Sequence, residues 1–310
     1  MADSILHIKD SYYFDVPRTF WRSHRTSLDQ VPKYLTDAHP HATLAEFNDA
    51  LTGKILIPQP FGTLKNFYER QSGFAISKFM IIELIIAAVL VFMFSRLAAR
   101  VRRGEVLRGR GWNLLESMVV FIRNDVARPA IGAHDADRFL PLLWTMFFFI
   151  LTCNLFGMLP WLGAPTGTFS VTLALAGITF VTILVSGVRQ FGPFGFFKNL
   201  VPPMDLPWYM LIFLWPFILI IEVFGLLIRN GVLAIRLLAN MVAGHLVLLA
   251  VLGLAFTIEA AASHGWAITA IISILGSTLF SLLELFVAFL QAYIFTFLSA
   301  LFIGAAIHHH

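Results

Sequence analysis

The chain has 310 residues, of which 58% are hydrophobic and 13% are charged, and its formal net charge is +4. Soluble domains carry about 25% charged residues, so this composition excludes a soluble domain and indicates an integral membrane protein. Its apolar runs are long and separated by Pro, Gly and charge clusters, which favours an all-α polytopic fold over a β-barrel. Most positive charge falls in the connecting loops, so we expect no nucleic-acid partner.

The N-terminal part of the chain, residues 1–75, is a polar extension without the apolar stretch of a signal peptide. Its aspartates argue against a mitochondrial transit peptide, because such peptides are poor in acidic residues. We expect the extension to consist of loop and a short amphipathic helix on the outside of the membrane. A weakly ordered tail is the alternative.

A membrane domain is expected over residues 76–307, and its first span covers residues 78–100. Lys78 and Glu83, near the start of this span, are interpreted as interfacial anchors. A cluster of arginines follows the span, and the positive-inside rule places this loop in the cytoplasm and the N-terminus outside. Residues 112–131 alternate apolar and charged side chains at helical spacing, which predicts an amphipathic helix on the cytoplasmic surface.

Residues 138–161 and 170–188 predict a hairpin of two further spans. Two longer apolar stretches follow, at residues 207–256 and 266–307, and continuous helices there would measure about 75 Å and about 63 Å. The hydrocarbon core is about 30 Å thick, so each stretch is either two spans with a turn or one oblique helix. With single crossings, loop charge places the tail at residues 308–310 on the cytoplasmic or matrix side.

Arg236 is a charge inside one of these long apolar stretches. A guanidinium stays protonated at working pH, and placing it at bilayer depth costs roughly 2.5–3.5 kcal/mol on insertion scales. Chains keep such a charge where it serves an ion path. On a continuous helix, Glu222 and Arg229 lie within about 60° of Arg236. Asn240 lies about 40° away on the other side, and His245 lies about 180° away.

Further polar residues occur in the last apolar stretch, where Glu284 and Gln291 are seven residues apart and share a helix face. Together with Glu222 and His245, Glu284 is an ionisable group in apolar surroundings and a candidate for a proton path. Bland alternatives stand beside this interpretation. Arg236 pairs statically with Glu222 in one of them, and in another His245 and Gln291 make only interior hydrogen bonds.

Three segments resemble subunit a of F-type ATP synthases, the membrane stator that faces the rotating ring of c subunits. They are residues 236–245 (RLLANMVAGH), 284–295 (ELFVAFLQAYIF) and 154–160 (NLFGMLP). The resemblance covers roughly residues 78–307. It implies that Arg236 is the essential proton-translocation arginine, with Asn240 and Gln291 as polar neighbours and Arg229 as a secondary residue.

The resemblance also implies that Glu222, His245 and Glu284 belong to two aqueous half-channels, and it favours one long oblique helix over residues 207–256. We expect His245 and Glu284 to approach each other across the last two helices. One departure is that the family often has Arg-Pro-x-Ser-Leu ahead of the essential arginine, where this chain has Asn230 in place of the proline and Val232 in place of the serine.

The implied function is proton translocation in an energy-transducing membrane, either a bacterial inner membrane or an organelle inner membrane. The implied partners are the c-ring, the b subunits of the peripheral stalk, other ATP synthase subunits and the lipid bilayer. No P-loop, nucleophile motif or metal-ligand spacing occurs, so we expect no cofactor or metal and a non-catalytic subunit. The alternative is a self-contained secondary transporter or ion channel with a midplane polar site.

Overall fold

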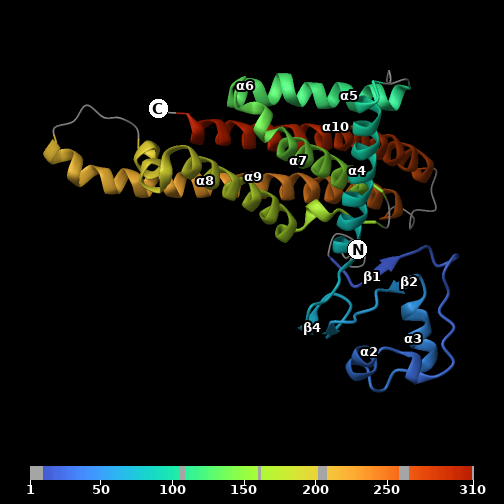
Figure 1. Ribbon diagram of the computed structural model, residues 1–310. Coiled ribbons are helices and arrows are strands. Elements are labelled where there is room, and N and C mark those ends of the chain that lie inside the picture. The colour runs from blue at the N-terminus through green and yellow to red at the C-terminus, as the bar shows by residue number, and fades with distance from the viewer. Residues whose placement is uncertain (1–9, 105–108, 160–161, 202–207, 258–264, 309–310) are drawn as a thin grey trace.

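A computed structural model of the chain describes residues 10–104, 109–159, 162–201, 208–257 and 265–308 (Figure 1). Five helices in this part of the chain are long and apolar enough to cross a bilayer. They are α4 (Lys78–Arg102), α7 (Ala136–Gly157), α8 (Phe169–Leu200), α9 (Trp208–Thr257) and α10 (Gly265–Ile307). The predicted all-α membrane architecture is confirmed, and the short strands of the structure lie only in its N-terminal part.

The first of the two long apolar stretches forms one helix, α9, without the turn that a two-span hairpin would need. Asn230 lies inside it, and its Nδ2 donates a hydrogen bond to the carbonyl oxygen of Leu226, 2.9 Å away. A glycine within a helix costs only about 1 kcal/mol relative to alanine, so Gly231 does not end α9. At 1.5 Å per residue, α9 is far longer than a hydrocarbon core is thick.

The helices α7, α8, α9 and α10 pack against one another and enclose the main hydrophobic core. In Figure 1, α4 stands upright while α8, α9 and α10 run across the view, so α4 is not parallel to them. The short 3-10 helix η4 (Pro165–Gly167) links α7 to α8. Gly192 interrupts α8 with φ 76°, a backbone conformation that favours glycine, and the chain bends there.

A helical segment precedes α7 and comprises α5 (Arg110–Phe121), the π-helical turn η3 (Ile122–Ala127) and α6 (Arg128–Ile131). It lies against α7 and α10. Trp144 of α7 donates a hydrogen bond from Nε1 to the carbonyl oxygen of Val119, 3.1 Å away. Arg123 makes a bidentate contact with Asp137 at 3.1 and 2.9 Å, which raises the pKa of the Arg123 guanidinium.

The N-terminal part is a small folded unit over residues 10–75, which adds strands to the expected loop and helix. Strand β1 (Tyr13–Asp15) pairs antiparallel with β2 (Lys54–Leu56), and β3 (Gly62–Leu64) pairs antiparallel with β4 (Arg70–Gly73). Its helices are η2 (Leu28–Gln30), α2 (Lys33–Ala38) and α3 (Leu44–Leu51). A core of four buried residues holds the unit together: Val31, Leu35, Phe47 and Leu51.

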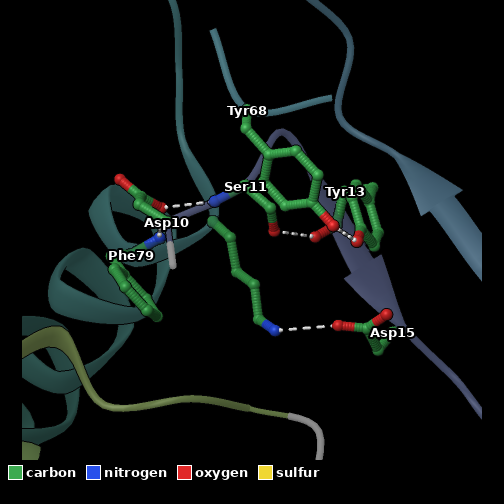
Figure 2. Close-up of polar contacts among 7 residues, drawn as sticks. Asp10, Ser11, Tyr13, Asp15, Tyr68 and Phe79 are labelled. Carbon is green, nitrogen blue, oxygen red and sulfur yellow. Dashed lines mark hydrogen bonds and ion pairs between the residues drawn. The ribbon is translucent and has the colours of Figure 1, made fainter. Parts of the chain in front are cut away.

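The N-terminal unit joins the first turn of α4 through polar contacts (Figure 2). One carboxylate oxygen of Asp10 accepts hydrogen bonds from the backbone N–H groups of Ser11 and Phe79, at 3.0 and 3.3 Å. Lys78 is only 2% exposed, and its Nζ lies 3.4 Å from Oδ2 of Asp15. Lys78 is therefore part of a buried ion pair at this junction. The sequence suggested an interfacial anchor at Lys78 but did not predict its pairing with Asp15.

Candidate functional site

Arg236 lies near the middle of α9 with a partly buried side chain. In the described part of the chain it makes no ion pair with an acidic residue. Glu222, its expected static partner in the bland alternative, instead lies 3.8 Å from Arg229 Nη2. Val232 and Ile235 beside Arg236 are exposed apolar residues. The guanidinium thus borders an apolar face of α9 that is formed by exposed side chains such as Val232 and Ile235.

A polar contact links α9 to α10 one turn beyond Arg236. Asn240 donates a hydrogen bond from Nδ2 to Oε1 of Gln291, 2.7 Å away. Gln291 is only 2% exposed, so this contact lies between the helices and not at the surface. The two residues that the resemblance implied as neighbours of the arginine therefore meet each other, and they hold α9 and α10 together beside it.

His245 and Glu284 also meet across α9 and α10, as the sequence analysis expected of their positions. His245 Nδ1 lies 3.9 Å from Oε1 of Glu284, and Glu284 is 6% exposed. Three buried atoms of this pair have no hydrogen-bond partner among the described residues. They are the two carboxylate oxygens of Glu284 and Nε2 of His245. Buried polar groups are normally satisfied by protein or water, so water is the partner that fits these three atoms.

Gly244 makes room for the Glu284 carboxyl group. A Cβ at this position would lie 2.7 Å from Oε1 of Glu284 and 3.2 Å from its Cδ. Those distances are below van der Waals contact, so any larger residue would displace the carboxyl group or separate the helices. The Glu284 carboxyl group therefore explains why a glycine stands at position 244 in the segment RLLANMVAGH.

The pair of Glu222 and Arg229 lies apart from the pair of His245 and Glu284. Glu222 and His245 are separated by about 35 Å along α9, at 1.5 Å per residue. A cavity of about 70 Å³ adjoins Glu222 and Arg229, and residues of α8 and α10 form its other walls. A cavity of this size holds water. The ionisable residues therefore form two separate clusters along α9, one of which includes Glu284 of α10, and Arg236 lies between them in the sequence of α9.

Sequence reasoning gave no role to a third polar contact, which joins α7 to α10. Asn154 of α7 donates from Nδ2 to the carbonyl oxygen of Ala288, 3.2 Å away and one turn beyond Glu284. Thr166 donates from Oγ1 to Oδ1 of Asn154 at 2.8 Å. Both side chains are buried. In the sequence, Asn154 is the one polar residue of the segment NLFGMLP, which resembles the family.

Comparisons with known proteins identify the family of the chain. The family model described as "ATP synthase A chain" matches residues 80–304. "ATP synthase subunit a" of Myxococcus xanthus (strain DK1622) is 44% identical over 208 residues, which is 66% of this chain and 65% of that protein. The protein of the same name from Anaeromyxobacter dehalogenans (strain 2CP-1 / ATCC BAA-258) is 45% identical over 215 residues, 68% of this chain and 53% of that protein.

A third relative, "ATP synthase subunit a 2" of Chlorobaculum tepidum (strain ATCC 49652 / DSM 12025 / NBRC 103806 / TLS), is 39% identical over 256 residues. That match covers 81% of this chain and 69% of the relative. The chain thus spans between about half and two thirds of the length of the first two relatives. With the family model matching 80–304, which includes all five apolar helices, the chain belongs to the ATP synthase A chain family and is an integral membrane protein.

Proposed function

We propose that this protein is the proton-translocating stator subunit of a rotary F-type ATP synthase. The observation that carries the proposal is Arg236, which borders an exposed apolar face of α9 and has no acidic partner among the described residues. An apolar face with one free cation fits a ring of c subunits that carry carboxylates. The relatives named ATP synthase subunit a support this interpretation.

In the proposed mechanism, a carboxylate of the rotor takes a proton from one half-channel, moves through lipid while neutral, and releases the proton into the other. Arg236 keeps the passing carboxylate ionised between the two half-channels and blocks direct leakage. Arginine suits this role because it does not give up its own proton at working pH. Asn240 and Gln291 keep α9 and α10 in place beside it.

The two clusters take the roles of two half-channels. His245 and Glu284 serve one of them, since an imidazole and a carboxyl group can each bind and release a proton. Glu222 serves the other, with Arg229 beside it at the small cavity. Each group passes protons through bridging water, so direct contact between successive groups is not required.

The orientation in the membrane belongs to the same proposal. The arginines after α4 favour a cytoplasmic position for α5, and five crossings then put the N-terminal unit outside and the C-terminus in the cytoplasm or matrix. In this orientation His245 and Glu284 serve the outer half-channel and Glu222 serves the inner one. The proposed location is a bacterial inner membrane or an organelle inner membrane, with the c-ring and peripheral stalk b subunits as partners.

The test uses the whole complex in inverted vesicles, where ATP-driven acidification is followed with a quenched dye. We expect Arg236→Ala to reduce pumping to background while the c-ring still co-purifies, and Arg236→Lys not to restore it, because ammonium is compact and more strongly hydrated. Arg229→Ala is the matched control and should retain partial pumping. Pumping near the wild-type rate in Arg236→Ala vesicles, or transport by the purified chain alone, would overturn the proposal.

A further inference from the structure

Glu83 of α4 is a carboxyl group that the proposed mechanism does not use. It lies four residues after Phe79 and three before Ile86, so it shares the buried face of α4 with them. Its Oε1 is buried and has no hydrogen-bond partner among the described residues. It lies five residues into the helix, about 7.5 Å from the Lys78 end.

The neighbours of Glu83 lie on two sides. On the side of the N-terminal unit, the charge of Asp10 acts on the Glu83 carboxyl group. Burial raises the pKa of Asp10, so this group binds a proton more readily than an exposed aspartate does. On the side of α7, the buried Cys153 is a titratable group within electrostatic reach of Glu83. Glu83 thus lies within electrostatic reach both of Asp10, at the junction shown in Figure 2, and of Cys153 in α7.

A hydrogen bond joins α7, next to Cys153, to the part of α10 that carries Glu284. Asn154 follows Cys153 in α7 and donates its hydrogen bond to Ala288 of α10. Ala288 is one helical turn from Glu284, whose carboxylate oxygens are buried without hydrogen-bond partners among the described residues. Polar groups with unmet hydrogen bonds therefore occur at both ends of this series, at Glu83 and at Glu284.

We propose that Glu83 transfers protons in the half-channel that leads from the N-terminal junction to Glu284 and His245. This rests on the proposed function and adds a residue of α4 to it. An unpaired buried carboxyl oxygen is costly, and water in a polar passage removes that cost. The Glu83 carboxylate accepts a proton from hydronium on the junction side, which leaves water, and then gives it to water on the Glu284 side.

The first test compares Glu83→Gln with Glu83→Asp in the whole complex. Glutamine has nearly the same shape and still forms hydrogen bonds, but it does not carry a proton, whereas aspartate does. We expect Glu83→Gln to slow ATP-driven pumping several-fold and Glu83→Asp to recover most of it. Glu116→Gln, on the exposed face of α5, is the matched control and should pump normally. Normal pumping by Glu83→Gln would overturn the proposal.

The second test asks whether water reaches Glu83, which a purely structural role does not require. In a Cys153→Ala background, Glu83→Cys should be inhibited by silver ions added on the side of the N-terminal unit. The adjacent Leu84→Cys points to an exposed apolar surface and should stay unreactive. An unreactive Glu83→Cys would overturn the proposal, and this result decides alone if Glu83→Gln fails to assemble. Loss of pumping in Arg236→Ala would then still uphold the proposed function.

Discussion

Gly244 is the residue whose identity is most directly tied to a neighbour, because the carboxyl group of Glu284 occupies the space where its side chain would be. The requirement is one of space, since the glycine sits inside a regular helix. A Cβ at this position would lie only 2.7 Å from Oε1 of Glu284, so a side chain there would displace the carboxyl group.

We expect Gly244→Ala to slow proton pumping while the complex still assembles, because the added methyl group displaces the carboxyl group that faces His245. Gly231→Ala in the same helix is the control, since a Cβ there meets nothing within 4 Å. Both variants also gain helix propensity, of about 1 kcal/mol, so the comparison isolates the contact. Equal pumping rates in the two sets of vesicles would refute this account.

Particular residues show how much of the site was predictable. The helical phase of α9 put His245 opposite Arg236, and the structure has Glu284 next to His245. The position of Glu83 near a helix start suggested an anchor, although its spacing from Phe79 and Ile86 pointed to a buried face. The contact between Asn154 and Ala288 depends on how α7 packs against α10. The periodicity of residues within one helix carries no information about such packing between helices.

At the scale of elements, the contact between α9 and α10 depends on paired polar side chains as well as on apolar packing. Hydrogen bonds between membrane helices contribute about 0.6 kcal/mol on average and at most about 1.7 kcal/mol. The bond between Asn240 and Gln291 is 2.7 Å long and partly buried, so we expect it to contribute within that range.

A double-mutant cycle measures this contribution. We expect Asn240→Leu and Gln291→Leu each to lower the thermal stability of the purified complex, and the double variant to lose less than the sum of the two. The coupling free energy should be between about 0.6 and 1.7 kcal/mol. Strictly additive losses would mean that the two side chains do not stabilise the helix pair together.

Hydropathy predicted the long helices but not their course. A run of 50 apolar residues is compatible with a hairpin or with one oblique helix, and only packing against α8 and α10 distinguishes them. The strands of the N-terminal unit have three or four residues each. Segments so short carry no recognisable alternation of polar and apolar residues, so the sequence indicated loop there.

At the scale of the whole molecule, the N-terminal unit is attached to the membrane helices through the junction around Lys78 and Asp15. Removing one partner of a buried ion pair typically costs about 3–5 kcal/mol, because the other charge stays buried. Exposed pairs such as Lys65 and Glu69 contribute only about 0–1 kcal/mol.

Accordingly, Lys78→Ala should make the N-terminal unit easier to cleave by protease in the assembled complex, whereas Lys65→Ala should leave the cleavage rate unchanged. Cleavage is read from the appearance of the truncated chain on a gel over time. Indistinguishable time courses for the two variants would show that the junction does not depend on the lysine.

The five crossings also predict the sides on which the two ends of the chain lie. In a Cys153→Ala background, Lys65→Cys and His308→Cys should react with a membrane-impermeant maleimide in vesicles of opposite orientation, because both positions are exposed and an odd number of spans separates them. Labelling of both cysteines in the same vesicles would require an even number of crossings.

The distance between the two ionisable clusters along α9 has an electrical consequence in the proposed function. If each cluster is open to water on its own side, the membrane voltage falls over the apolar segment between them and not over the full bilayer. A charge that crosses the membrane gains about 2.3 kcal/mol per 100 mV. With the oblique course that the sequence predicts for α9, part of that fall is directed along the plane of the bilayer. The field would then push a charged rotor sideways, which is the direction of torque.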